Sequence, residues 1–267
     1  MILSNPAKWL LRVAVVLCLA FIYVPLAVVV VNSFNADSTF AWPPQELTLR
    51  WWSAAAHNSG VRDAVWVSVK VGLAATTVAL VLGTMAAFAL QRYRFFGRDA
   101  ISLLVVLPIA LPGIVTGIAL NNTFRTVLGV DLSLITIVVA HATFCIVVVF
   151  NNVVARLRRL GESAEQASMD LGATRWTTFR LITFPSLRSA LLAGALLAFA
   201  LSFDEIIVTT FTAPAQTETL PIWILANMFR PTAAPIVNVV GAVLIVASII
   251  PIYLSQKLSG ETSGGRL

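Results

Sequence analysis

Long apolar stretches limit this chain to one kind of environment. A helix needs roughly 20 residues to cross a hydrocarbon core of about 30 Å. Apolar residues make up 58% of the 267 residues and charged residues only 11%, whereas a soluble domain has about 25% charged residues. We therefore expect a single all-helical transmembrane domain over residues 1–267. Its six predicted spans are 12–31, 64–90, 101–120, 132–150, 190–212 and 236–254.

The Lys and Arg residues between these stretches predict the orientation, because basic residues are retained on the cytoplasmic side of a membrane. With a cytoplasmic N-terminus, Arg50, Arg62, Arg125 and Arg230 fall outside, and Lys70 lies within a span. Both termini are then cytoplasmic, and the net charge of +6 reflects topology rather than a nucleic-acid-binding surface. The cytoplasmic residues are Lys8, Arg12, Arg92, Arg94, Arg98, Arg156, Arg158, Arg159, Arg175, Arg180, Arg188, Lys257 and Arg266.

Motifs for catalysis and for metal binding are missing from the sequence. It has no G-x-x-x-x-G-K-[ST] loop for phosphates and no G-x-S-x-G nucleophile elbow. His57 and His141 are isolated, and the position of His141 within the fourth span favours a helix-to-helix hydrogen bond. Cys18 and Cys145 lie in apolar surroundings, which favours packing over a disulfide or a metal site. We expect neither catalytic residues nor a metal in this chain.

The longest cytoplasmic segment, residues 151–189, has the signals of two helices joined at a glycine. Ser163 followed three residues later by Gln166 fits a capping box at the start of the first helix. Gly172 suits the left-handed position that ends such a helix. Thr174 can cap the second helix. This segment is thus expected to fold as helix, corner and helix.

Apolar residues recur at helical spacing on both helices of this segment. Two amphipathic helices resting on the bilayer surface would have this pattern, and so would a docking surface for a partner protein. The residues alone leave both interpretations open. The apolar ridges consist of Ala164, Ala167 and Leu171 on the first helix and of Trp176, Phe179 and Ile182 on the second.

A family resemblance favours the docking interpretation. The segment resembles the EAA loop of ABC importer permeases, whose pattern is E-A-A, three residues, G, nine residues, I-x-L-P. This chain has Q-A-S at 166–168 and I-T-F-P at 182–185, with Gly172 at the matching distance between them. In that family the short helix of the loop docks in a groove of the ATPase subunit and transmits its closure to the membrane helices. By resemblance, the coupling residues are Glu165, Gln166, Ala167, Ser168, Gly172, Ile182 and Pro185.

The chain departs from the family pattern at three positions of the loop. Gln166, Ser168 and Phe184 stand where the family has Glu, Ala and Leu. Gln166 keeps hydrogen-bonding capacity but cannot form an ion pair with the ATPase. Glu165 lies about 100° further around the helix and cannot simply take its place. Pro185 is expected to break the chain before the fifth span.

The resemblance covers most of the chain, including R-Y-R-F-F-G-R after the second span and S-F-D-E in the fifth. It looks most like the second permease subunit of spermidine/putrescine importers. The resemblance implies a type I ABC importer fold in the bacterial inner membrane and transport by alternating access. It also implies a second permease, an external solute-binding protein, and two ATPase subunits that bind ATP and Mg in place of any cofactor in this chain.

Two acidic residues, Asp204 and Glu205, interrupt the otherwise apolar fifth span. An ionised side chain at the centre of a membrane costs about 2.5 to 3.5 kcal/mol on insertion scales, so it normally faces a partner or a wet path. Lys70 lies at a comparable depth and could pair with either acid to join two helices. Alternatively, one carboxylate faces the transport pathway and attracts a cationic amine.

These acids also fit a different class of protein, a secondary transporter driven by an ion gradient, in which Asp204 or Glu205 carries the coupling proton. That class leaves the loop motif unexplained. A membrane scaffold without transport activity would leave the acids themselves unexplained.

Further features are expected to shape the architecture. Gly113 and Gly117 form a G-x-x-x-G face that is expected to let helices approach closely, for example at an interface with a second permease. Pro108 and Pro112 are expected to bend or loosen the third span. The polar, glycine-rich tail at 259–267 is expected to be disordered.

Overall fold

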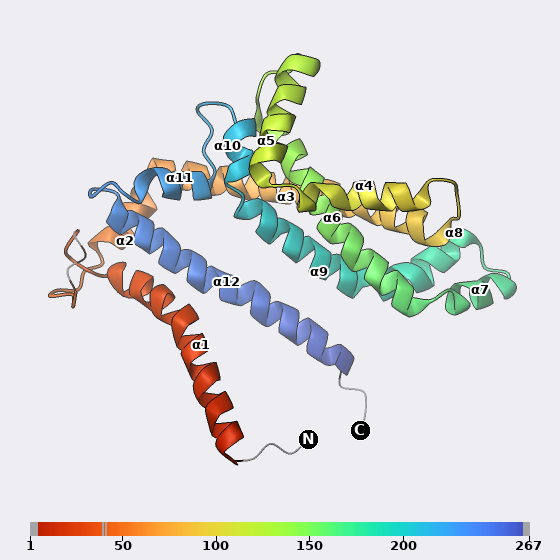
Figure 1. The fold of residues 1–267 in the computed structure, drawn as a ribbon, viewed down its shortest axis with the longest axis horizontal. Coiled ribbons are helices and arrows are strands. Elements are labelled where there is room, and N and C mark those ends of the chain that lie inside the picture. Colours follow the sequence, from red (N-terminus) through yellow and green to blue (C-terminus); the bar gives the residue numbers. More distant parts are fainter. Residues whose placement is uncertain (1–4, 39, 41, 264–267) are drawn as a thin grey trace. The chain divides into compact units, whose positions relative to one another are not determined.

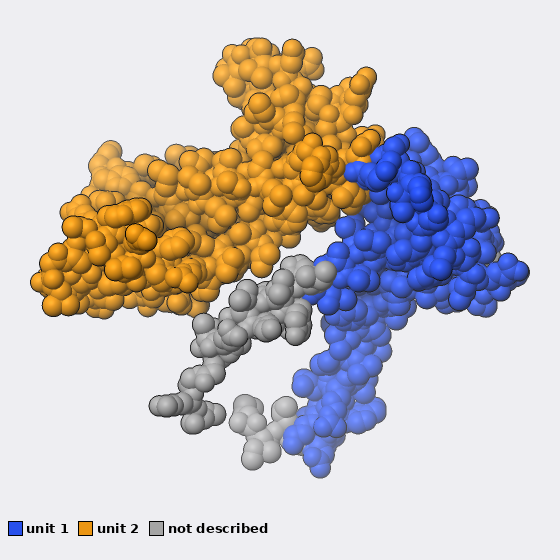
Figure 2. Space-filling model, turned by 180° about the vertical axis from the view of Figure 1, so that it is seen from behind, with its two compact units in different colours: residues 1–62, 224–254 blue, residues 63–223, 255–267 orange. Residues whose placement is uncertain are grey.

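The computed structural model describes residues 5–38, 40 and 42–263, and its regular elements are helices (Figure 1). The chain divides into two compact units, residues 1–62 with 224–254 and residues 63–223 with 255–267 (Figure 2). The elements are α1 (Asn5–Asn32), α2 (Arg50–His57), α3 (Ser59–Arg92), α4 (Arg98–Ala110), α5 (Gly113–Asn122), the π-helical turn η1 (Thr123–Val127), α6 (Leu134–Leu160), α7 (Ser163–Asp170), α8 (Arg175–Thr178), the π-helical turn η2 (Phe179–Thr183), α9 (Phe184–Phe203), α10 (Ile207–Thr212), α11 (Leu220–Asn227) and α12 (Ala234–Ser263).

Length and apolar composition confirm an all-helical membrane protein. In the described part of the chain, four helices are long and apolar enough to cross a membrane, and a bent pair of helices raises the number to five. The apolar part of α12, Ala234–Ile249, is shorter than these. The four long helices are Asn5–Asn32, Ser59–Arg92, Leu134–Leu160 and Arg175–Phe203.

The third predicted span, 101–120, is not one straight helix. The segments on either side of Leu111 are bent by 106° relative to each other. Leu111 has an extended backbone, with φ −81° and ψ 143°, because the ring of Pro112 disfavours helical geometry in the preceding residue. Pro108 lies inside α4 without ending it. The predicted bend is therefore confirmed, and it is located at Pro112.

The predicted cytoplasmic loop 151–189 is shorter in the structure. Helix α6 continues to Leu160 because Val153, Val154 and Leu157 extend its buried face past the end of the predicted span. On the other side, α8, η2 and α9 follow one another directly from Arg175. The chain leaves these two long helices only between residues 161 and 174.

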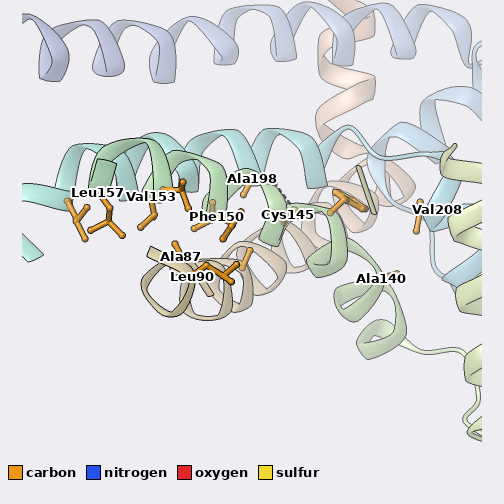
Figure 3. Packing of buried hydrophobic residues seen from close by; sticks show 14 residues of the cluster. Ala87, Leu90, Ala140, Cys145, Phe150, Val153, Leu157, Ala198 and Val208 are labelled. Carbon is orange, nitrogen blue, oxygen red and sulfur yellow. Dashed lines mark hydrogen bonds between the residues drawn. The ribbon is translucent and has the colours of Figure 1, made fainter. Parts of the chain in front are cut away.

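The core of the second unit lies around α6, which packs against α3 and α9 (Figure 3). Glycines allow the close approach: a Cβ added at Gly83 of α3 would lie 2.9 Å from the carbonyl oxygen of Ile146. The thiol of Cys145 is buried and donates to the carbonyl of Ala198 at 3.3 Å. Close packing of this kind holds helices together in lipid, where the hydrophobic effect contributes little.

The glycine face of α5 packs against α10 of the same chain. A Cβ at Gly113 would lie 3.6 Å from Ile207, and one at Gly117 would lie 2.7 Å from the ring of Phe211. Both neighbours belong to α10. The small residues therefore bring α5 and α10 together in the same unit, which confirms the predicted close approach of helices.

Gly117→Ala should destabilise the chain relative to Gly113→Ala. The added methyl group at Gly117 would overlap with Phe211, whereas the same group at Gly113 would make ordinary van der Waals contact. Overpacking of this kind costs about 1 to 3 kcal/mol. The melting temperatures of the two purified variants in one detergent test this difference. Equal values would contradict the close contact between α5 and α10.

The first unit contains α1, α2 and the part of α12 up to Leu254. Gly241 of α12 lies beside Val29 of α1, since an added Cβ would be 3.1 Å from the Val29 side chain. The indole N–H of Trp51 in α2 donates to the carbonyl of Asn35 at 3.0 Å, which fastens α2 to the segment after α1. Helix α12 runs to Ser263. Residues 259–263 of the predicted disordered tail are thus helical in the structure, and 264–267 lie outside the described residues.

Candidate functional site

The first helix of the loop, α7, begins at Ser163 as predicted, but without the predicted capping box. Glu162 occupies the cap position, and Ser163 is already the first helical residue, so its hydroxyl is not placed to cap the helix. The amide of Gln166 donates instead to the carboxylate of Glu162 at 3.4 Å. The carboxylate-bearing turn at the start of α7 also suits the positive end of the helix dipole.

The corner after α7 follows the sequence prediction. Gly172 has φ +88°, the left-handed conformation that glycine adopts without strain. Its N–H donates to the carbonyl of Met169 at 2.9 Å, and the next N–H, that of Ala173, donates to Ser168 at 3.1 Å. Thr174 then caps α8 by accepting from the N–H of Thr177 at 3.2 Å. The predicted helix, corner and helix are confirmed.

The two predicted apolar ridges differ in exposure. Leu171 is 89% exposed and Trp176 is 69% exposed, so both are available to a partner. Phe179 is only partly exposed, because its ring packs edge-on against Phe88 of α3 with centroids 5.8 Å apart. In the second ridge, Trp176 is therefore available to a partner, whereas Phe179 packs against α3 of the same chain.

Pro185 does not break the helix that leads into the membrane. It lies in the first turn of α9, where the missing N–H and the fixed φ of proline are tolerated. The preceding turn, η2, is π-helical and connects α8 to α9 without an interruption. Movement of α8 can thus reach α9 through a continuous helical segment.

Glu165 is held within the chain. Its carboxylate lies 2.8 Å from the guanidinium of Arg92 at the end of α3, and Arg92 also lies 3.2 Å from Glu162. Glu165 therefore does not take the place of Gln166, whose side chain is exposed. The role of Arg92 could not be predicted, because no local signal links it to residues 70 or more positions away.

The predicted fifth span, 190–212, is interrupted where its acids lie. Helix α9 ends at Phe203 and α10 begins at Ile207, so both acids occupy the short segment between two helices. Glu205 accepts a hydrogen bond from the N–H of Val208 at 2.8 Å and so caps the start of α10. Asp204 is exposed, and within the described residues its carboxylate has neither a hydrogen bond nor an ion pair. The two neighbouring acids therefore differ in their contacts.

The predicted ion pair of Lys70 with Asp204 or Glu205 does not form among the described residues. The ammonium of Lys70 instead lies over the ring of Trp66, 5.1 Å from its centroid, one helical turn earlier in α3. A long lysine side chain can reach such a neighbour on its own helix. Lys70 therefore leaves the carboxylate of Asp204 free.

His141 of α6 connects both sides of the interruption. Its Nδ1 lies 2.7 Å from the hydroxyl of Ser202 in α9, and its Nε2 lies 2.8 Å from the hydroxyl of Thr209 in α10. The imidazole is fully buried. The predicted helix-to-helix hydrogen bond is confirmed. The two hydrogen bonds of His141 fix both ends of the acidic segment, residues 204–206 between α9 and α10.

The comparisons with known proteins place this chain in a family. Residues 79–260 match the family described as binding-protein-dependent transport system inner membrane component. This match covers the coupling loop and the acidic segment. The chain belongs to this family and is a multi-pass protein of the inner membrane.

Several curated relatives match nearly the full length of the chain. The spermidine/putrescine transport system permease protein PotC of Escherichia coli is 32% identical over 92% of this chain and 92% of its own. The putrescine transport system permease protein PotI of the same organism is 33% identical over 96% of this chain and 92% of its own. The putative 2-aminoethylphosphonate transport system permease protein PhnV of Salmonella typhimurium is 30% identical, with coverage of 92% and 91%.

A solved structure supports the fold. A bacterial ABC transporter involved in the import of the acidic polysaccharide alginate contains a chain that superposes with a TM-score of 0.70. The alignment covers 98% of this chain and 99% of that one, at 17% identity. The fold is therefore that of an ABC importer permease. Neither this likeness nor the family match supports the alternative of a secondary transporter driven by an ion gradient.

Proposed function

We propose that this chain is a permease subunit of an ATP-driven importer of polyamines or of closely related amines. The observation that carries the proposal is the near-full-length similarity to permeases named for spermidine and putrescine transport, at 32% and 33% identity. The solute in the name of the phosphonate relative also carries an amino group. A cationic amine is thus the common chemistry.

The acidic segment between α9 and α10 supports this choice of solute. Asp204 offers an exposed carboxylate without a partner among the described residues, at a place where the helix of the fifth span is interrupted. A charge-assisted hydrogen bond between a carboxylate and an ammonium group is about twice as strong as a neutral one. Asp204 is the candidate contact with the amine as it passes, and Glu205 shapes the segment by capping α10.

The coupling loop supports ATP as the energy source. In this proposal the surface of α7 and α8 docks on an ATPase subunit, with exposed Leu171 and Trp176 as apolar contacts. Gln166, Ala167 and Ser168 lie on or beside this surface, and Gly172 sets its corner. Closure of the ATPase moves the loop, and the continuous helix through Ile182 and Pro185 passes the movement to α9.

Family membership implies a solute-binding protein, an ATPase and a second permease as partners. In the full proposal two ATPase subunits bind ATP and Mg and carry out hydrolysis, while this chain holds no cofactor. Six spans cross the membrane, with α4 and α5 together forming the third and α12 the sixth. Both termini then face the cytoplasm, in agreement with the distribution of basic residues.

Reconstitution tests the proposal. The chain is placed in proteoliposomes with its second permease and ATPase, and the solute-binding protein is added on the outer side. We expect uptake of radiolabelled putrescine or spermidine only when ATP is present, and competition by the other polyamine but not by a neutral diol of equal length. Preferential uptake of 2-aminoethylphosphonate would reassign the solute. Uptake by this chain alone under an imposed proton gradient would overturn the ATP-driven mechanism.

A further inference from the structure

Arg92, the last residue of α3, joins this helix to the segment at the start of α7, which is far away in the sequence. One guanidinium nitrogen, Nη2, donates to Glu165 Oε1 at 2.8 Å and to the carbonyl oxygen of Gly161 at 3.2 Å. The other, Nη1, donates to Glu162 Oε1 at 3.2 Å. The Arg92 side chain is only 15% exposed. Arg92 therefore binds the start of α7 from the C-terminal end of α3.

The carboxylate of Glu165 extends this contact to a third segment. The oxygen that accepts from Arg92 also accepts from the hydroxyl of Thr183 at 2.8 Å. Thr183 is buried and ends η2, directly before α9. One carboxylate oxygen of Glu165 in α7 thus accepts hydrogen bonds from the last residue of α3 and from the residue directly before α9.

Polar contacts of this kind are the main attachment of α7 to the rest of the chain. None of its residues is buried, so apolar packing contributes little to holding the helix in place. The contact between the hydroxyls of Ser168 and Thr178, 3.0 Å apart, ties α7 to α8 but does not reach α3. The ion pair of Arg92 with Glu165 connects α7 itself to α3, and the ion pair with Glu162 connects the residue directly before α7 to the same helix.

The other end of this connection is rigid. Ala87 and Leu90 of α3 are buried in the core around α6, only a few residues before Arg92. The guanidinium therefore projects from a helix that is fixed by close packing. An arginine fork with several acceptors is also more directional than a lysine ammonium.

We propose that Arg92 is a positioning residue that couples the movement of α7 to α3, in addition to the path from α8 to α9; this inference rests on the proposed function of the loop. When an ATPase subunit displaces α7, the helix then moves two membrane helices together. Without Arg92 the displacement reaches α9 through the chain but no longer reaches α3. ATP hydrolysis continues, and fewer solute molecules are transported for each ATP consumed.

The ratio of transported solute to hydrolysed ATP tests this inference in the reconstituted importer. Arg92→Gln is expected to leave ATP hydrolysis within about twofold of the unaltered importer, because the docking surface of α7 lies elsewhere, and to lower the ratio about fivefold or more. Arg94→Gln is the matched control, since it removes the same charge from an exposed side chain two residues away. We expect the control to keep the ratio within about twofold.

A second variant keeps the test decisive if Arg92→Gln fails to assemble. Glu165→Gln removes the ion pair while retaining the size of the side chain, and it should lower the ratio to a similar degree. If both residues act through the same contact, the double variant should be no worse than either single one. An unchanged ratio in both single variants would overturn the inference. This includes the case in which ATP hydrolysis and solute transport fall in proportion.

The same measurement separates the inference from the proposed function. If the unaltered importer does not couple ATP hydrolysis to amine uptake, the proposed function fails. If it does, and Arg92→Gln keeps the same ratio, only the role of Arg92 is refuted.

Discussion

Replacing Gly172 with valine is expected to release the ATPase from this chain during purification and to reduce ATP-dependent uptake at least about tenfold, which corresponds to about 1.4 kcal/mol. Gly172 has φ +88° at the corner between α7 and α8. A β-branched residue is a clear outlier in this region, and the left-handed conformation costs an ordinary residue about 1 to 2 kcal/mol. The corner would relax, and the exposed side chains of Leu171 and Trp176 would lose their relative placement.

Steric exclusion cannot explain such a loss, because a Cβ added at Gly172 would meet nothing within 4 Å. Gly97 provides the matched control, since it has φ +83° and equally open surroundings, but lies between α3 and α4. Gly97→Val should retain the ATPase. Both variants place valine at a left-handed position, so comparing them by copurification and uptake shows whether the effect depends on strain at the corner between α7 and α8 in particular. Equal retention of the ATPase in both would contradict a docking role for the corner.

Replacing Asp204 with asparagine is expected to lower polyamine uptake by about tenfold or more, because hydrogen bonds to charged groups contribute about 1.5 to 3 kcal/mol. Asparagine keeps the shape of the side chain and removes only the charge. The importer should still assemble, since the carboxylate of Asp204 has no hydrogen bond or ion pair within the described part of the chain. Initial uptake rates with saturating solute-binding protein measure the effect.

Glu205→Gln serves as the control for this prediction. The glutamine oxygen can still accept from the N–H of Val208, so the start of α10 stays capped. Uptake should change far less than in the Asp204 variant. Because Lys70 lies over Trp66 rather than against an acid, neutralising Lys70 should not rescue Asp204→Asn. Equal losses in the two acid variants, or rescue through Lys70, would contradict the assignment.

Features that depend on a few adjacent residues were predictable from the sequence. The left-handed corner at Gly172, the cap at Thr174 and the bend before Pro112 each follow from local backbone chemistry, and the structure contains all three. The capping box at Ser163 was wrong although it is local, because Glu162 occupies the cap position and Ser163 is already the first residue of the helix. A one-residue shift is enough to move the hydroxyl away from the cap position.

Contacts between distant residues were not predictable in this way. Arg92 and Glu165 meet only after α3, α6 and α7 have packed, and the sequence between them contains no signal for that contact. The expected ion pair of Lys70 relied on equal depth in the membrane. Depth does not fix which way a side chain points, and the interruption after Phe203 changes the course of the chain next to the acids.

The 106° bend between α4 and α5 has a consequence for hydration. The last carbonyl groups of a helix have no partner inside it, and the backbone at Leu111 is extended. Unpaired backbone groups cost several kcal/mol each in hydrocarbon, so irregular backbone at membrane depth is tolerated only against protein or water. Ile109, Ala110, Leu111 and Pro112 are exposed in this chain. In the proposed six-span topology this bend lies at membrane depth, so we expect water or a neighbouring subunit, rather than lipid tails, beside these residues.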